Sequence, residues 1–200
     1  MAISATQVKV LRDMTAAGFM ECKAALTESN GDLDKAVVIL RTRGQAKAVK
    51  RAGRTTAQGL VGTYIHPGGQ VGVLVEVDCE SDFVARTDDF QTLVKEIAMH
   101  VAAANPLYVS REEVPAEKLE RERDIYRAQL ENSDKPAAIV DKIVEGKLNS
   151  YYEQNVLVDQ PSIRDPKTTI GELVMAAIAK LGENITVSRF ARFKIGETAE

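Results

Sequence analysis

The sequence predicts an α+β fold, in which an N-terminal three-helix bundle precedes a small antiparallel three-stranded sheet packed with helices and a helical hairpin. The first observation is a pair of segments with the two-residue period of strands, at residues 60–66 and 71–78, on either side of the turn-forming residues 67–70. The second is another alternating segment near the C-terminus, at residues 185–195. The third is that the segments between them carry apolar residues at the spacing of amphipathic helices.

The composition is that of an ordinary globular protein and narrows the classes of function. The 200 residues are 44% hydrophobic and 28% charged, with a formal net charge of −3, so no global positive field draws the chain to nucleic acid or anionic membrane. No apolar run approaches the roughly 20 residues of a membrane helix, and the N-terminus lacks a signal-peptide pattern. With Cys22 and Cys79 as its two cysteines, we expect a cytoplasmic protein with reduced thiols and no zinc cage.

Residues 1–44 are expected to form a docking domain of three short helices. Ser4 and Gln7 have the spacing of a capping box at the start of the first helix. Asp32 is expected to cap the third helix, and Gly44 to follow its last turn. The bundle holds no polar cluster suited to catalysis, and helical modules of this size commonly serve as docking surfaces.

Residues 45–58 are expected to form a basic linker helix. Lys47, Lys50, Arg51 and Arg54 alternate with alanines and other small residues in this segment. One interpretation is a patch that binds phosphates, which would make the chain an RNA- or ribosome-binding protein. A solvated linker is favoured, because no aromatic residue is interleaved and no glycine-rich phosphate loop follows.

Residues 59–200 are expected to form the core domain, beginning with a β-hairpin. Val61, Thr63 and Ile65 share one face of its first strand. Residues 67–70 form the turn, since Pro67 fixes φ and the glycines after it permit positive φ. The second strand runs from Val71 to Asp78 and leads into a corner, after which a helical pattern starts at Asp88.

That corner, Ser81-Asp82-Phe83-Val84, is the first candidate site. A carboxylate and an aromatic ring between two rigid elements can be presented to another molecule with little entropy left to lose on binding. The alternative is structural: Phe83 fills the core and Asp82 caps the following helix. The local sequence alone favours the structural alternative.

The remainder of the core domain is expected to be mostly helical. A helical hairpin is expected at about residues 110–157, with a turn at residues 132–136 and a brief extended run at residues 156–158. Thr169 and Glu172 form another capping box, and Gly182 closes the helix that it starts. His100 lies beside an apolar helical stripe and is interpreted as a structural or surface histidine.

No known enzyme motif occurs in the chain. Walker A, dinucleotide-binding, nucleophile-elbow and zinc-protease patterns are all missing from the sequence. Cys79 and His66, across the hairpin, could make a nucleophile and base, but the valines before Cys79 predict an unreactive thiol. We therefore expect a binding or exchange protein without a cofactor rather than an enzyme.

Several segments together resemble the bacterial elongation factor Ts family. These are residues 8–26 with Asn30-Gly31-Asp32, residues 75–86, residues 105–109, Gln160-Pro161, and residues 182–193. The resemblance covers nearly the whole chain in order. The family usually has Thr at the position of Ser81 and Met-Met-Asp at residues 19–21. Longer members carry two sheet modules, so the resemblance to the short class implies a homodimer.

The resemblance implies a guanine-nucleotide exchange factor for elongation factor Tu. In the family, the turn corresponding to Asp82-Phe83 enters the G domain near the Mg²⁺ and phosphate site, with Ser81 and Val84 shaping the turn. It further implies that the N-terminal helices, similar to ubiquitin-associated domains, hold the G domain elsewhere, without implying ubiquitin binding. The contacts that it suggests are Leu11, Arg12, Ala17, Gly18 and Met20. Neither a membrane nor direct nucleic-acid contact is implied.

Overall fold

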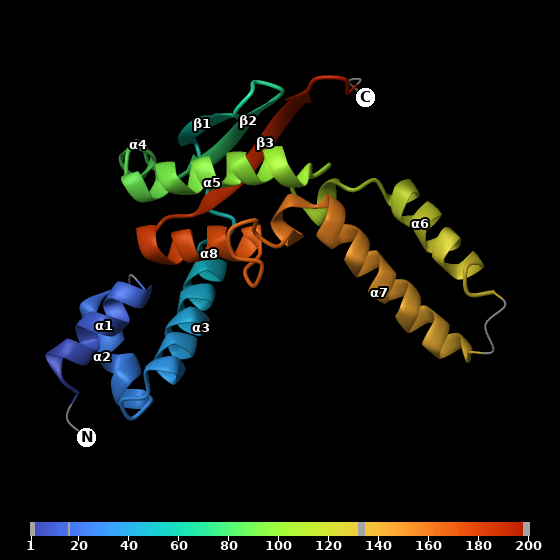
Figure 1. Cartoon of the computed structure of the whole chain (residues 1–200). Helices are drawn as coiled ribbons and strands as arrows, with labels where there is room; N and C mark the ends of the chain where they lie inside the picture. Colours follow the sequence, from blue (N-terminus) through green and yellow to red (C-terminus); the bar gives the residue numbers. More distant parts are fainter. Residues whose placement is uncertain (1–2, 16, 132–134, 198–200) are drawn as a thin grey trace. The chain divides into compact units, whose positions relative to one another are not determined.

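A three-stranded antiparallel sheet is the centre of the fold and confirms the α+β class. The computed structural model describes residues 3–15, 17–131 and 135–197 (Figure 1). The sheet has the order β1-β2-β3, formed by β1 (Gln58–Ile65), β2 (Val71–Cys79) and β3 (Ile185–Lys194). The last strand therefore returns from far along the chain to pair with the hairpin.

The chain divides into two compact units, each with its own packing. The first unit comprises residues 1–59, 78–91 and 174–186. The second unit comprises residues 60–77, 92–173 and 187–200. Because the strands and two of the helices pass from one unit to the other, neither unit is a single continuous segment.

In the first unit, α1 (Ala5–Thr15), α2 (Phe19–Glu28) and the start of α3 (Leu33–Arg51) form the expected bundle (Figure 1). The Ser4–Gln7 capping box is confirmed, since each residue's backbone N–H donates to the other's side chain. Asp32 accepts from the Lys35 N–H at 3.0 Å and caps α3. The bundle buries one apolar core: Val8, Leu11, Cys22, Ala25, Leu26, Ala36 and Leu40.

The expected end of the third helix at Gly44 is wrong. α3 continues to Arg51, so residues 45–51 of the expected linker helix belong to it; the rest of that expectation is wrong, because residues 52–57 are not helical and β1 begins at Gln58. A Cβ at Gly44 would lie 3.2 Å from the Cβ of Ala179, on α8 (Ile170–Leu181). Gly44 thus permits two helices to approach closely, a role that sequence alone does not distinguish from that of a helix terminator.

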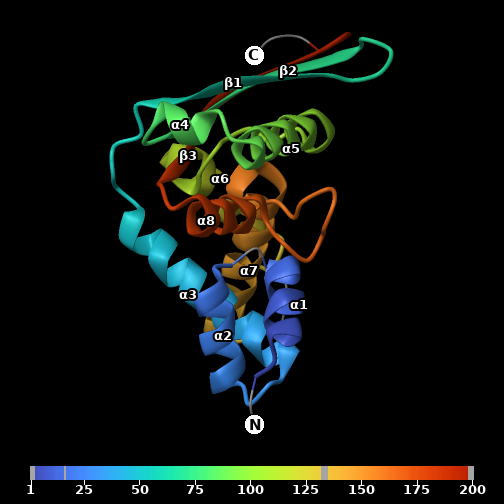
Figure 2. The ribbon, with the colours of Figure 1, turned by 90° about the vertical axis from the view of Figure 1, so that its left-hand side faces the viewer.

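In the second unit, the sheet rests on the long part of α5 (Asp88–Ala104), as Figure 2 shows. Val73, Val75 and Val77 are buried on that side of β2. The hairpin turn has positive φ at Gly68 and Gly69, as predicted. The face of β1 that carries Val61, Thr63 and Ile65 is exposed, and the opposite face packs on α5 through Gly62, where a Cβ would lie 2.2 Å from Val94 Cγ1.

The predicted alternation of β3 is interrupted once. Ile185 and Val187 face inward, but further along Phe190 and Arg192 are the more buried residues, while Phe193 is exposed. The alternation thus changes phase between Val187 and Phe190. Arg192 can turn inward because its guanidinium donates to the Ala102 carbonyl at the end of α5.

The helical hairpin is formed by α6 (Ala116–Ala128) and α7 (Ala137–Asn155), after a 3₁₀ turn at Arg111–Glu113. Ion pairs Arg123–Glu145 and Arg127–Asp141 join the two helices at 3.5 Å each. The predicted turn at residues 132–136 lies partly outside the described residues. Of the extended run expected at residues 156–158, only Val156 is extended, and it forms an isolated β-bridge with Tyr108. The rest of that expectation is wrong, because Leu157–Asp159 form a 3₁₀ turn.

α8 begins and ends as predicted. The Thr169–Glu172 capping box is present, with both bonds at 3.1 Å, and Gly182 closes the helix at φ 82°. His100 is structural: it is buried on α5, and its Nε2 bonds Gln160 Oε1 at 2.8 Å. Burial lowers the pKa of His100 below its ordinary value.

Candidate functional site

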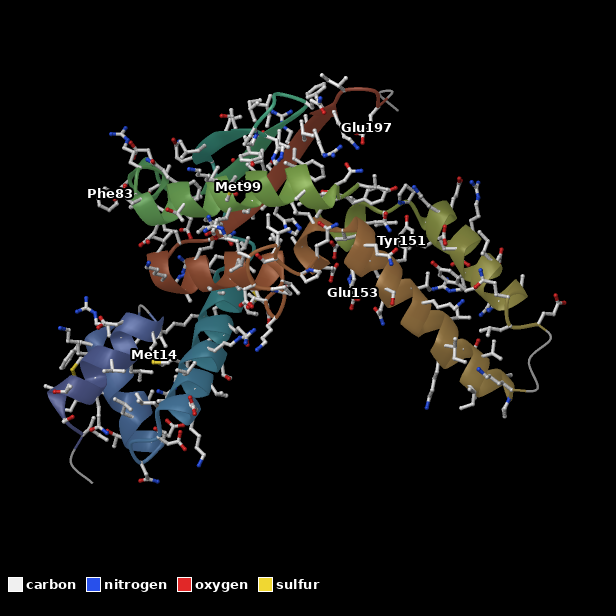
Figure 3. All side chains as sticks on the ribbon, in the orientation of Figure 1. Met14, Phe83, Met99, Tyr151, Glu153 and Glu197 are labelled. Carbon is white, nitrogen blue, oxygen red and sulfur yellow. The ribbon has the colours of Figure 1, made fainter. Side chains whose placement is uncertain are left out.

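The corner after β2 is a single turn of helix, α4 (Asp82–Ala85), with an exposed aromatic ring. Phe83 is 77% exposed, and Figure 3 shows its side chain directed away from α4. The next residue, Val84, is 5% exposed and faces the interior with Ala85. The interpretation of Phe83 as a core residue is therefore wrong, because α4 turns Val84 inward in its place.

The helix caps around this corner also differ from the structural alternative. Ser81 is extended and its hydroxyl accepts from the Val84 N–H at 3.3 Å, so Ser81, not Asp82, caps α4. The following helix is capped by Thr87, whose hydroxyl accepts from the Phe90 N–H at 3.3 Å. Asp82 caps neither helix, and its carboxylate is left on the exposed side of the turn.

Asp82 has one ion-pair partner on its own helical turn. Its Oδ2 lies 2.8 Å from Arg86 Nη2, and both side chains are largely exposed. Exposed pairs at this spacing stabilise a protein by less than about 1 kcal/mol. The carboxylate is thus available to exchange Arg86 for another partner at little cost.

The base of the turn is bound to two other segments of the first unit. The Glu183 carboxylate accepts from the Ser81 N–H at 2.9 Å and from the Ser81 hydroxyl at 2.6 Å. The Glu80 carboxylate accepts from the Asn184 N–H at 2.7 Å and lies 3.5 Å from the Arg54 guanidinium. Sequence reasoning gave Glu80, Glu183 and Asn184 no role, although all three belong to segments that carry the family resemblance.

Cys79 is not a nucleophile poised for reaction. Its buried thiol donates to the Ser81 carbonyl at 3.1 Å. Burial, and then the nearby Glu183 carboxylate, raise the pKa of Cys79, which disfavours the reactive thiolate. His66 pairs with Val71 at the other end of β2, so the strand separates it from Cys79.

The candidate contacts on the N-terminal helices divide by exposure. Arg12, Gly18 and Met20 are exposed, with Met20 at 70%, and Ala17 is half-buried. Leu11 is fully buried in the bundle core, so any part that it has in docking is indirect. Gly18 is the N-cap of α2, and its N–H donates to Glu21 Oε2 at 3.4 Å. A shallow hollow on α2 is lined by Met20, Lys23, Ala24, Thr27 and Glu28.

The basic segment is partly neutralised by carboxylates of its own chain. Lys47 pairs with Glu21 of α2, and Arg54 with Glu80. The pairing with Lys47 lowers the pKa of Glu21. A surface for RNA phosphates needs lysines and arginines that face solvent unpaired, so these contacts weaken the alternative of an RNA-binding patch.

Two further properties concern only the described residues, 3–15, 17–131 and 135–197. Among them, no group of three or more His, Cys, Asp or Glu side chains is arranged to bind a metal ion. No helix of this part of the chain combines the length and apolar character needed to cross a membrane.

Comparison with known proteins decides the family. A family model described as elongation factor TS matches residues 11–197. The chain belongs to the elongation factor Ts family. It is 57% identical to elongation factor Ts of Caldanaerobacter subterraneus subsp. tengcongensis, over 99% of each chain. It is 56% identical to that of Fervidobacterium nodosum, over 98% of this chain and 100% of the relative. To that of Geobacter sulfurreducens it is 55% identical, over 100% of this chain and 93% of the relative.

Family membership gives the chain its role as a translation elongation factor that promotes nucleotide exchange on elongation factor Tu. The near-complete coverage of relatives of similar length agrees with the single sheet module seen here.

Proposed function

We propose that the chain releases GDP from elongation factor Tu by pushing the Asp82-Phe83 turn into the G domain, beside the Mg²⁺ and phosphate site. The observation that carries this proposal is the 77% exposure of Phe83 on a turn fixed at both ends by β2 and α5. A large ring held in solvent by a rigid corner gains its apolar burial from a partner.

The ring and the carboxylate have separate tasks. Phe83 displaces the packed elements of the G domain that hold the Mg²⁺ ligands, and Mg²⁺ tolerates little distortion of its octahedral geometry. Asp82 exchanges its weak pairing with Arg86 for donors near the ion. GDP loses a charge-stabilising partner and dissociates faster. By linkage, the exchange factor weakens nucleotide binding as much as the nucleotide weakens binding of the exchange factor.

We further propose that residues 1–44 dock on the G domain away from the nucleotide. Arg12, Gly18 and Met20 supply the exposed contacts, with Ala17 at their edge. Residues 59–200 then act as the domain that carries the wedge, and residues 45–58 connect the two. Because this separate surface supplies part of the affinity for elongation factor Tu, the Asp82-Phe83 turn, which acts as a wedge, can use its own contacts to weaken the binding of GDP.

Exchange of this kind needs no chemical step, so we propose that the chain is not an enzyme, takes no cofactor and acts with its partner in the cytoplasm. The protein accelerates release by stabilising the open, nucleotide-free state of the GTPase.

We propose a homodimer formed through the outer face of the sheet. Val61, Ile65, Leu74 and Phe193 are exposed there, across all three strands. Two charged residues of this face are paired with each other, since Arg189 lies 2.5 Å from Glu76. An exposed apolar face suits a second copy of itself. Sedimentation of the wild type as a monomer at micromolar concentration would contradict the dimer, and Leu74→Asp is expected to convert a dimer to monomers.

Release of a fluorescent GDP analogue from elongation factor Tu tests the proposed function. Substoichiometric amounts of the chain are expected to accelerate release, because each molecule acts repeatedly. The absence of acceleration would reject the proposal. A steeply salt-dependent affinity for RNA, lost on reversing the charges of Lys47 and Lys50, would instead support RNA binding.

A further inference from the structure

The turn that carries Phe83 is too small to hold its own shape. α4 has 4 residues, and an isolated helix of one turn is unstable in water because nucleation is unfavourable. Asp82 and Phe83 add little, since both side chains are exposed. The conformation of the turn therefore depends on its buried residues, Val84 and Ala85, and on polar contacts made at Ser81.

Ser81 connects the turn to the rest of the protein through its backbone N–H and its hydroxyl. Its backbone N–H and its hydroxyl donate to the two oxygens of Glu183, at 2.9 and 2.6 Å. The same hydroxyl accepts from the Val84 N–H, which fixes the first turn of α4. One carboxylate thus orients the residue that caps the helix, through bonds that its charge strengthens.

A second carboxylate makes the reciprocal connection. Glu80 precedes Ser81 and accepts from the Asn184 N–H at 2.7 Å, next to Glu183. Asn184 is buried, and its side-chain amide donates to the Arg54 carbonyl at 2.8 Å. Glu80 also pairs with the Arg54 guanidinium. The turn is thus fastened to the connector between α8 and β3 and to the segment after α3.

We propose that Glu183, supported by Glu80, is a positioning residue that holds the Asp82-Phe83 turn ready for insertion into the G domain. This inference rests on the proposed function of the turn. Glu183 points at Ser81 and acts through the conformation of Phe83. Ordering the turn in advance removes part of the entropy cost that insertion would otherwise carry.

The first test uses the free protein and amide hydrogen exchange at the Val84, Ala85 and Arg86 amides. Glu183→Gln keeps the size of the side chain but replaces the two charged acceptors of Ser81 by one neutral amide oxygen, so one Ser81 donor loses its acceptor. The expected result is exchange at least roughly tenfold faster at these amides, because the capped state is less populated. Glu153→Gln, which changes an exposed carboxylate on α7, is the matched control and is expected to leave them unchanged.

The second test measures GDP release from elongation factor Tu at increasing concentrations of each variant. For Glu183→Gln, the maximal release rate is expected to fall roughly tenfold, equal to about 1.4 kcal/mol, while the half-saturating concentration stays the same. Ser81→Ala is expected to behave likewise, and Ser81→Thr, which keeps the hydroxyl, to retain the wild-type rate.

A double variant separates positioning from a general structural effect. In a Phe83→Ala background, Glu183→Gln is expected to cause no further loss, because the residue that it positions is already gone. A further tenfold loss there, or unchanged hydrogen exchange in Glu183→Gln alone, would overturn the positioning role while leaving the wedge intact. Full exchange activity in Phe83→Ala would reject the wedge itself, and the positioning role with it.

Discussion

Removal of the Phe83 ring should separate the stability of the protein from its activity. Phe83 is 77% exposed, so folding buries about a quarter of its surface. Full burial of a Phe side chain stabilises by about 1.5–3 kcal/mol, so this quarter contributes roughly 0.4–0.7 kcal/mol. The better helix propensity of Ala offsets much of that amount, by about 0.5 kcal/mol. Phe83→Ala should therefore change the free energy of unfolding by no more than about 0.5 kcal/mol.

The same arithmetic predicts a large effect on exchange. If insertion buries the remaining three quarters of the ring, the open complex loses about 1–2.3 kcal/mol, which slows GDP release roughly 5- to 50-fold. Stopped-flow displacement of a fluorescent GDP analogue measures this rate, and urea denaturation measures the stability. Phe90→Ala is the matched control: Phe90 is fully buried, so its removal should cost about 3–5 kcal/mol of stability.

One combination of results would refute this reasoning. If Phe83→Ala lowered the free energy of unfolding by more than about 2 kcal/mol, the ring would be supporting the fold to the extent typical of core residues. A loss of exchange that only matched the loss of folded protein would then assign Phe83 a structural role.

Three further predictions concern packing and pH. Gly62→Ala should lower the free energy of unfolding by about 1–3 kcal/mol, because the added Cβ would overlap Val94. In urea denaturation the midpoint should therefore fall, and a midpoint equal to wild type would contradict the close packing of β1 on α5. Gly44 lies where α3 meets α8, so Gly44→Leu should lower the free energy of unfolding, measured in the same assay, by about 1–3 kcal/mol. Gly44→Ala should lower it less, because Ala is smaller than Leu and has a better helix propensity than Gly. Burial lowers the pKa of His100 in the folded state, so the unfolded chain binds the proton at higher pH. Stability should therefore fall as the pH drops below about 6.5, and His100→Gln should flatten this part of the profile measured by thermal unfolding.

Sequence patterns predicted the elements of this fold better than the directions of their faces. The alternation in β1 located the strand but not its buried side, because Val61 and Ile65 are as apolar as core residues and yet lie on the exposed face. In β3 the alternation changes phase before Phe190, and Arg192, on the more buried side beyond that point, has its partner in the Ala102 carbonyl at the end of α5. Such long-range partners leave no local signal in the sequence.

The candidate site shows the same limit. Local sequence favoured burial of Phe83, and only the family resemblance pointed to an exposed ring; the structure shows why the ring is exposed, because Val84 takes the inward position. Leu11 was named as a contact from the resemblance, although its place in the bundle core follows from helical periodicity. The bond between Ser81 and Glu183 joins residues 102 positions apart, beyond the reach of local patterns.

That separation has a consequence for how the protein is made. The partners of Glu80 and Ser81 in the connector before β3 are synthesised about a hundred residues after them. A nascent chain that still lacks this connector carries the exposed ring without the carboxylate that fastens it. If Glu183 has the positioning role proposed above, the turn acquires its ordered form only after this connector has been synthesised, later than the strand that leads into it.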